Sequence, residues 1–490
     1  MVINSLSFLA FFSVLFIIYW AAGGSIRKYV LFIGNVVFCL SWSISALAYI
    51  IGFAVVGYAA GRLCEGSSKK KAAFTAVTAF LAVLVTVKYS SFIAGILQPV
   101  INAVGIKFSA STLKIVLPVG LSFYTFKSIS YVVDCYKGKI QSEHNMITYF
   151  NYVAFFPQLI CGPIERAERL IPELNEYKIF DYNQVTYGLK LTFWGMFKKM
   201  AIADAIAGYV DKVYADVPSK SGFVFIIAAV FYSFQIYCDF SGYSDMAIGA
   251  AKMLGIETKK NFDSPYFSSS IQEFWRRWHI SLSKWFCDYV YIPCGGSRCS
   301  KIKYYRNLML TFLASGLWHG ANWTFIVWGG IHGALQIIES FFRKKKTKNE
   351  EILPVRSGGV KVLYAVKHWI SVLLVFVLVT IAWVFFRANS LSDAFYILTH
   401  AFSGIGDIKI YLVNAYYAFG LEPFGYIQLF VPIILLLIHD YAELKGDVIE
   451  QIGFMTEKKR WVIYCLVIAL FLSLCSIFGV NSGDFIYSKF

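Results

Sequence analysis

The chain has 490 residues, of which 58% are hydrophobic and 15% charged, against about 45–50% and about 25% in soluble chains. This composition excludes a water-soluble globular protein, an intrinsically disordered chain and a disulfide-rich scaffold. The net charge is +16, but the basic residues cluster in short loops between apolar runs. Such clustering indicates membrane orientation and not nucleic-acid binding.

Apolar runs recur from end to end, and we expect one all-α polytopic membrane domain over residues 1–480. In chain order the candidate spans are residues 6–22, 29–45, 46–63, 72–87, 115–133, 149–159, 187–207, 223–237, 307–317, 323–342, 369–386, 426–438 and 461–480. Several of them are too short or too polar to cross a hydrocarbon layer of about 30 Å. The sequence therefore predicts about eleven transmembrane helices, with re-entrant and interfacial helices between them.

The positions of Lys and Arg predict which loops face the cytoplasm. Basic residues follow the first apolar run at Arg27 and Lys28, and they gather again in residues 62–71, 343–361 and 445–460. Because cytoplasmic loops are enriched in Lys and Arg, we assign all four groups to the cytoplasm. The segment 343–361 is then a cytoplasmic basic loop, and counting spans forward from it places the tail, residues 481–490, outside.

The middle of the chain is more polar than a lipid-facing helix. The segment QIYCDFSGYSD places Asp239, Ser241 and Asp245 within an apolar sequence, where burial without partners is costly. Ser241 and Asp245 share a face of a continuous helix, and Gly242 is a candidate break in that helix. Two interpretations stay open, a structural network that holds spans together and participation in a functional site.

Next comes EFWRRWHISLSKWF, residues 273–286, in which aromatic and basic residues alternate. This pattern is typical of a helix at the membrane interface that directs Arg and Lys toward lipid headgroups. Such cations also suit the phosphates of a cytoplasmic donor such as coenzyme A. We take four residues as candidate donor contacts, namely Arg276, Arg277, Lys284 and Arg298.

Two histidines lie in the third polar segment, LWHGANWTFIVWGGIHG. His319 falls at the junction of two apolar runs, between Gly316 and Gly320, where another chain or a substrate can approach closely. An ionisable residue within a membrane is a functional candidate by default. His332 lies beyond an expected bend, and both a packing role and a functional role stay open for it. No metal is expected, because the cysteine spacings match no zinc pattern.

The chain resembles the membrane-bound O-acyltransferase (MBOAT) family in QIYCDFSGYSDMAIG, in EFWRRWHISLSKWF with the following DYVYIPCGG, and in LWHGANWTFIVWGGIHG. With PVGLSFYTFKSISYVVDCY and FFPQLICGPIERA, it is most similar to the bacterial branch of alginate and peptidoglycan O-acetyltransferases. The resemblance covers a motif core at residues 115–340. It implies a funnel of helices in the bacterial cytoplasmic membrane, with polar tunnels that meet at a buried histidine.

The resemblance also implies roles for individual residues. His319 takes the place of the family's catalytic histidine and His279 that of the second histidine. The tail FIYSKF matches a terminal F-x-Y-x-x-F motif in which a tyrosine, here Tyr487, carries the acyl group. The family usually has Arg where Cys287 stands and Leu where Cys294 stands, which affects the donor-binding loop and neither histidine.

The resemblance implies an O-acyltransferase that O-acetylates an exported cell-surface polysaccharide. The expected donor is acetyl-CoA, with no permanently bound cofactor, and the expected partners are membrane lipid and an extracytoplasmic SGNH-type transferase. D-alanyl transfer to teichoic acid is an alternative within the enzyme class. A polysaccharide transporter and a non-catalytic scaffold are alternatives outside it, since a transporter also buries carboxylates and histidines.

Overall fold

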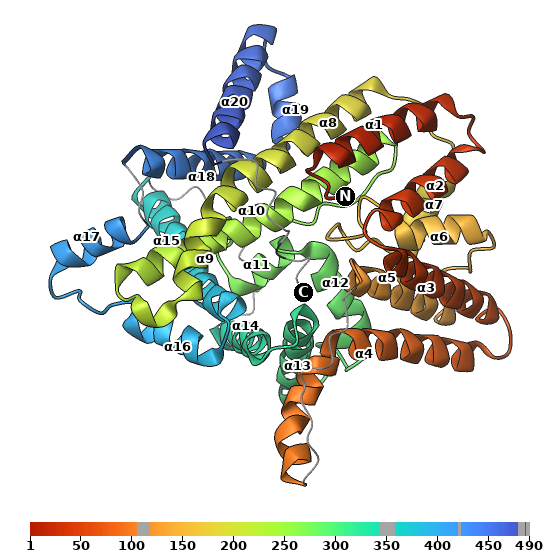
Figure 1. The fold of residues 1–490 in the computed structure, drawn as a ribbon, viewed down its shortest axis with the longest axis horizontal. Helices are drawn as coiled ribbons and strands as arrows, with labels where there is room; N and C mark the ends of the chain where they lie inside the picture. The colour runs from red at the N-terminus through yellow and green to blue at the C-terminus, as the bar shows by residue number, and fades with distance from the viewer. Residues whose placement is uncertain (105–117, 343–357, 420–422, 479–485, 487–490) are drawn as a thin grey trace. The chain divides into compact units, whose positions relative to one another are not determined.

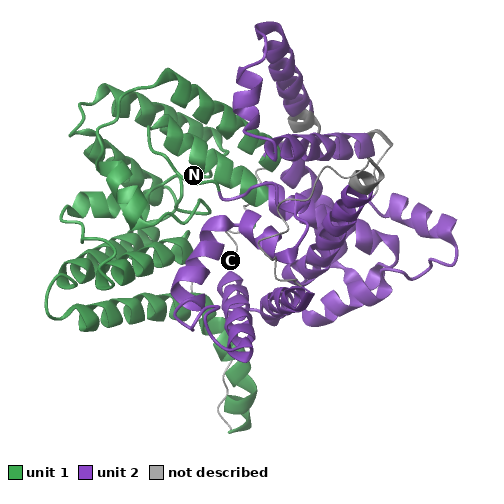
Figure 2. Cartoon of the chain, turned by 180° about the vertical axis from the view of Figure 1, so that it is seen from behind, with its two compact units in different colours: residues 1–199, 239–260, 481–490 green, residues 200–238, 261–480 purple. Residues whose placement is uncertain are grey.

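The structure is a computed structural model that describes residues 1–104, 118–342, 358–419, 423–478 and 486. In these ranges every regular element is a helix and no strand occurs, which agrees with the predicted all-α class (Figure 1). The chain divides into two compact units (Figure 2). Unit 1 comprises residues 1–199, 239–260 and 481–490, and unit 2 comprises residues 200–238 and 261–480.

Unit 1 begins with α1 (Leu6–Ala21), α2 (Arg27–Leu40), α3 (Ile44–Leu63), α4 (Lys69–Ala103), α5 (Leu121–Tyr136), α6 (Met146–Ala154), α7 (Ala167–Asn175) and α8 (Tyr182–Met196). The π-helix η2 (Phe197–Asp204) follows α8 without a break and carries the chain into unit 2. The long helix α10 (Phe223–Met253) brings the chain back into unit 1 at Asp239.

Unit 2 contains, besides the first part of α10, the helices α9 (Ala205–Ala215), η3 (Val217–Ser219), η4 (Pro265–Phe267), α11 (Ile271–Arg277), α12 (Ile280–Phe286), the π-helix η5 (Cys287–Tyr291), α13 (Lys301–His319), α14 (Trp323–Phe342), α15 (Gly358–Arg387), α16 (Leu391–His400), α17 (Ile408–Ala418), α18 (Pro423–Glu443), α19 (Val448–Gly453) and α20 (Glu457–Phe478).

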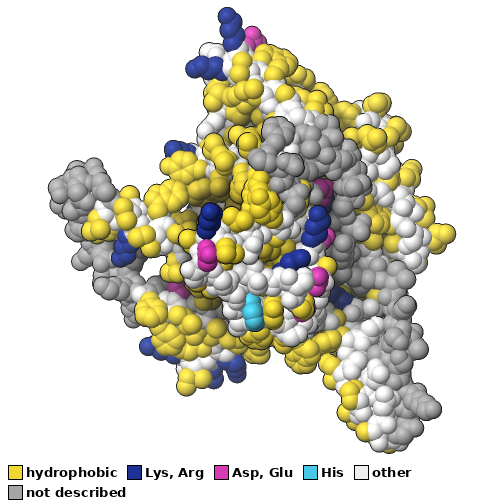
Figure 3. All heavy atoms as spheres, turned by 60° about the vertical axis from the view of Figure 1, so that its left-hand side comes forward, with side chains coloured by type: hydrophobic (Ala, Val, Ile, Leu, Met, Phe, Trp, Pro, Cys, Tyr) yellow, Lys and Arg dark blue, Asp and Glu magenta, His cyan; other side chains and the backbone are white. Residues whose placement is uncertain are grey.

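Among the described residues, six helices are long and apolar enough to cross a membrane, namely α3, α4, α10, α14, α15 and α18. Large hydrophobic side chains lie exposed along α3, α4, α14, α15 and α18, whereas α10 is mostly buried, and yellow apolar surface covers much of the face in Figure 3. Such exposure is costly in water and is expected in lipid. The apolar runs therefore serve as membrane helices, as the composition indicates.

The predicted break in α10 at Gly242 is wrong, because the helix continues through this residue. Gly242 lies directly against α8, and an added Cβ there would be 2.7 Å from the carbonyl oxygen of Gly195. One pair further along the antiparallel helices, a Cβ at Gly249 would be 2.5 Å from the carbonyl oxygen of Gly188. The glycines let two backbones touch, as small residues do between membrane helices.

We expect leucine at Gly242 to destabilise unit 1 by about 1–3 kcal/mol, because the closely packed α8 leaves no room for the larger side chain. The measurement is the melting temperature of detergent-solubilised protein, followed by size-exclusion chromatography after heating. Leucine at Gly208 is the control, since an added Cβ there meets nothing within 4 Å. Equal melting temperatures for both variants would contradict the close packing of α8 on α10.

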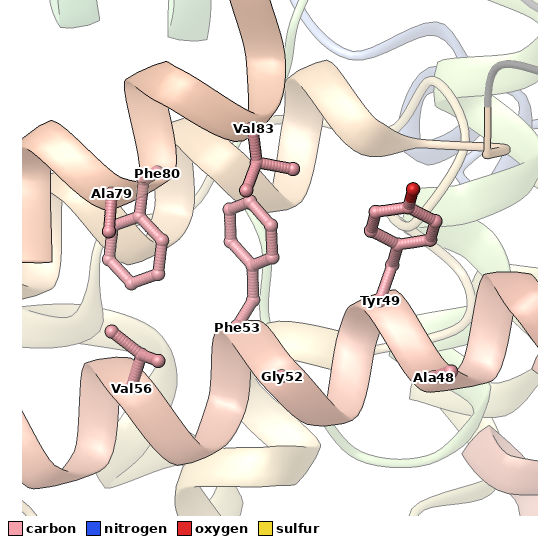
Figure 4. Close-up of a pocket in the computed structure, with 8 residues that line it drawn as sticks. All are labelled: Ala48, Tyr49, Gly52, Phe53, Val56, Ala79, Phe80 and Val83. Carbon is pink, nitrogen blue, oxygen red and sulfur yellow. The ribbon is translucent and has the colours of Figure 1, made fainter. Parts of the chain in front are cut away.

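An apolar pocket of about 350 Å³ lies between α3 and α4 in unit 1 (Figure 4). Its walls include the rings of Tyr49, Phe53 and Phe80, and the lining residues include no histidine, carboxylate or cation. The rings of Phe53 and Phe80 stack with centroids 4.7 Å apart. The candidate chemistry of this chain lies elsewhere.

Candidate functional site

His319 is the last residue of α13 and is buried, with 3% of its surface exposed. Close packing of α13 on α14 fixes this end of the helix. An added Cβ at Gly316 would lie 2.3 Å from the carbonyl oxygen of Phe325, and one at Gly329 would lie 2.3 Å from that of Phe312. The glycines on either side of the predicted catalytic histidine therefore hold its backbone in place.

Aromatic rings surround the His319 imidazole. The ring centroids of Trp318, Trp328 and Phe386 lie 4.8, 5.0 and 5.1 Å from it, and the Trp328 ring is perpendicular to it. Large aromatic side chains exclude water from the space that they fill, and electrostatic interactions strengthen in such surroundings. A proton transfer at His319 would take place in this environment.

His279 lies between α11 and α12, with 1% of its surface exposed and a φ of 41°. The sequence predicts one interfacial helix over residues 273–286, and this prediction is wrong in its middle. The chain turns at His279 through the left-handed region, so that Trp278 and His279 are both buried. Burial also holds the pKa of His279 well below its ordinary value, which keeps the ring neutral at physiological pH.

Backbone strain at His279 leads to a test. The left-handed region costs a residue other than glycine about 1–2 kcal/mol. Glycine and alanine at position 279 both remove the imidazole, but only alanine retains the strain. We expect the glycine variant to be more stable than the alanine variant by about 1 kcal/mol, the reverse of their usual order in helices. Thermal unfolding of the two variants in one detergent measures this, and a more stable alanine variant would contradict it.

Two tryptophans of unit 2 lie between three of its histidines, namely His279, His319 and His332. Trp318 neighbours His319 and also lies 6.2 Å from His279 between ring centroids. Trp328 lies 5.0 Å from both His319 and His332. In the sequence these tryptophans are visible only as members of the family motifs. Their position between the histidines depends on tertiary packing, which the motifs do not reveal.

His332 is fully buried, and its Nδ1 accepts a hydrogen bond of 3.2 Å from the indole Nε1–H of Trp275. This bond assigns the neutral tautomer with hydrogen on Nε2. Among the described residues Nε2 has no hydrogen-bond partner. The bond to Trp275 favours the packing role that the sequence leaves open for His332.

Of the predicted donor-binding cations, Arg276 and Arg277 lie on α11, Lys284 lies on α12, and Arg298 lies between η5 and α13. Arg276, Lys284 and Arg298 have exposed side chains. Arg277 is different, because its guanidinium pairs with Glu273 at 2.9 Å and donates to the carbonyl of Asp263 at 3.2 Å. Three of the four cations are therefore accessible to a ligand, while Arg277 is held by neighbouring acceptors.

Both carboxylates of the polar segment form ion pairs within unit 1, and the pair of Asp239 is buried whereas the Asp245 side chain is 20% exposed. Asp239 pairs with Lys199 at 2.6 Å, and Asp245 pairs with Lys198 at 2.6 Å. The two lysines lie on η2, and π-helical turns often occur at functional sites. Sequence reasoning overlooked them, although a Lys-Lys pair inside the apolar run FWGMFKKMAIAD is a signal that could have found them.

Tyr487 and most of the basic loop 343–361 lie outside the described residues. Ile486, the neighbour of Tyr487, is described, and its backbone N–H donates a hydrogen bond of 2.8 Å to Oδ2 of Asp239. No three His, Cys, Asp or Glu side chains gather as metal ligands in the part of the chain that the structure describes.

Comparison with known proteins gives consistent matches. Residues 139–366 match the model of the membrane-bound O-acyltransferase family. The chain is 39% identical to the probable alginate O-acetylase of Pseudomonas aeruginosa over 409 residues, which cover 82% of this chain and 75% of that protein. It is 37% identical to the peptidoglycan O-acetyltransferase of Helicobacter pylori, over 59% of this chain and 57% of the relative.

A teichoic acid D-alanyltransferase of Bacillus subtilis is also similar, with 30% identity over 47% of this chain and 60% of its own length. The family match contains His279, His319 and His332, together with the cations of α11 and α12.

Proposed function

Because the chain belongs to the membrane-bound O-acyltransferase family, and is thus an integral membrane O-acyltransferase, we propose that it O-acetylates an exported cell-surface polysaccharide. The observation that carries the proposal is the burial of His319 among aromatic rings where α13 meets α14. The names of the alginate and peptidoglycan relatives support the choice of acetyl group and acceptor.

The proposed donor is acetyl-CoA on the cytoplasmic side. Its phosphates would bind the exposed cations Arg276, Lys284 and Arg298. This assignment agrees with the predicted topology of about eleven crossings, in which basic loops face the cytoplasm and the tail at 481–490 faces outside.

In the proposed reaction His319 acts as general base. Its neutral imidazole takes the proton of the Tyr487 hydroxyl while the phenolic oxygen attacks the thioester carbonyl carbon. The carbon–sulfur bond then breaks, and the imidazolium returns the proton to the departing thiolate, which leaves as free coenzyme A. His279 would orient the donor or stabilise the oxyanion.

A tyrosine is a suitable carrier, because a phenyl ester keeps much of the transfer potential of the thioester. The acetyl group then passes to an extracytoplasmic SGNH-type transferase, which places it on a sugar hydroxyl. This relay explains how a donor made in the cytoplasm serves an acceptor outside the membrane.

The decisive experiment follows acetyl-CoA consumption by purified protein in lipid nanodiscs, with mass spectrometry of the C-terminal peptide. We expect release of coenzyme A and a gain of one acetyl group on Tyr487. A transporter or a scaffold would consume no thioester. A D-alanyl group on the same peptide of protein isolated from cells, before acetyl-CoA is added, would instead favour the teichoic acid reaction, which the Bacillus subtilis relative suggests.

Donor binding has its own prediction. Replacing Lys284 and Arg298 together by alanine is expected to raise the KM for acetyl-CoA a few-fold with little change in kcat, because each exposed charge pair contributes about 0.2–1 kcal/mol. The increase should shrink at high salt. Alanine at Lys409, an exposed residue on α17, is the control. An unchanged KM would remove these two cations from the donor site.

A further inference from the structure

Asp239 makes two separate contacts with its two carboxylate oxygens. Oδ1 accepts from the Lys199 ammonium at 2.6 Å, and Oδ2 accepts from the backbone N–H of Ile486 at 2.8 Å. All three residues belong to unit 1. The second contact joins the middle of α10 to a residue 247 positions later in the sequence. An ionised acceptor makes such a backbone bond stronger than one between neutral groups.

The Lys199–Asp239 ion pair is buried and held by the close packing of the surrounding helices. The side chains of Lys199 and Asp239 are 1% and 3% exposed. Lys199 lies on η2, directly after α8, and the contact of Gly195 with Gly242 holds α8 and α10 together close by. A buried carboxylate needs a counter-charge, which Lys199 supplies. The second oxygen then remains to accept a hydrogen bond from a backbone.

A purely structural role would need only the ion pair. Helix α10 satisfies its own backbone, so the Ile486 N–H comes from outside the helix pair and occupies an oxygen that the lysine does not use. The contact is to a backbone amide and not to the isoleucine side chain. It therefore fixes the position of the chain at residue 486 whatever side chain stands there.

We propose that the Lys199–Asp239 pair is the docking point for the C-terminal segment of this chain. Asp239 acts as a positioning residue that holds Ile486 and so sets the register of Tyr487, one residue further on, for acyl loading. This inference rests on the proposed function in one respect, namely that Tyr487 carries the acyl group. The docking itself does not depend on the chemistry.

The first test measures hydrogen–deuterium exchange of the C-terminal peptide in the full-length protein in nanodiscs. Asn at position 239 removes the charge that holds the Ile486 amide, so Asp239→Asn should speed exchange at this amide by about tenfold or more. Asp440→Asn is the control, because Asp440 is also a buried carboxylate, but it contacts Tyr237 at 2.6 Å, Ser264 and His439, which lie in unit 2. A wild-type rate of hydrogen exchange at the Ile486 amide in a folded Asp239→Asn protein would overturn the docking proposal.

A second test leaves the ion pair untouched. Proline at 486 deletes the donating N–H, whereas valine retains it. With acetyl-CoA present, we expect Ile486→Pro to lower acylation of Tyr487 about tenfold or more and Ile486→Val to stay near wild type. Normal acylation of the proline variant would overturn the proposal, even if Asp239→Asn fails to fold.

The two ideas fail in different ways. If Tyr487→Phe retains polymer acetylation while exchange at Ile486 still depends on Asp239, the carrier role fails and the docking stands. If Tyr487→Phe abolishes polymer acetylation while hydrogen exchange at Ile486 does not depend on Asp239, the carrier role of Tyr487 is supported and the docking is contradicted.

Discussion

Alanine in place of His319 is expected to lower the rate of acetyl transfer by a factor of about 10² to 10⁴, the usual contribution of a general base. The residue lies at the end of α13, with Trp318, Trp328 and Phe386 around its ring. Aromatic neighbours offer no other strong base. The measurement is the release of coenzyme A from acetyl-CoA by purified protein.

Loss of packing must be separated from loss of the base. Phenylalanine at 319 fills the aromatic surroundings but accepts no proton, so His319→Phe should lose activity as fully as His319→Ala while it unfolds at a higher temperature. Alanine at His368, an exposed histidine on α15, is the control for histidine removal. Wild-type turnover in His319→Phe would show that another group takes the proton.

Phenylalanine in place of Tyr487 is expected to reduce polymer acetylation to the background level, a loss of about two orders of magnitude or more. The substitution keeps the ring and removes only the nucleophilic oxygen, without which no acyl-enzyme ester forms. Acetyl content of the polymer and the mass of the C-terminal peptide should change together.

The matched control for this variant is Tyr417→Phe. Tyr417 is an exposed tyrosine on α17. It loses the same hydroxyl and should leave acetylation unchanged. If Tyr487→Phe supports normal acetylation at normal protein levels, the acceptor polymer or its transferase takes the acetyl group without a tyrosine relay.

The apolar runs predict the helices well where hydrophobicity alone decides. Residues 323–342 form α14 as predicted, and residues 46–63 form nearly all of α3. The span predicted at 72–87 is too short, because α4 continues through the polar residues that follow it. Lys88, which resembles a helix end in the sequence, donates instead to Ser122 of α5 at 3.4 Å.

The site is harder to predict, because its geometry depends on contacts between distant segments. The sequence identifies His279 and His319 through family motifs, but the motifs contain no sign that Trp318 lies beside both rings. Likewise, Asp239 and Asp245 are evident in the sequence as carboxylates within an apolar segment, while their lysine partners depend on how α8 meets α10. Local patterns specify which groups are costly to bury, and only tertiary packing selects their partners.

The glycine contacts between α13 and α14 have a consequence for turnover. With Gly316 and Gly329 against the opposing backbone, neither helix can slide or rotate without a steric clash. This packing thus holds the backbone that carries the imidazole at the end of α13. In the proposed reaction, the thioester and the hydroxyl would therefore both travel to a histidine whose helix does not move toward them.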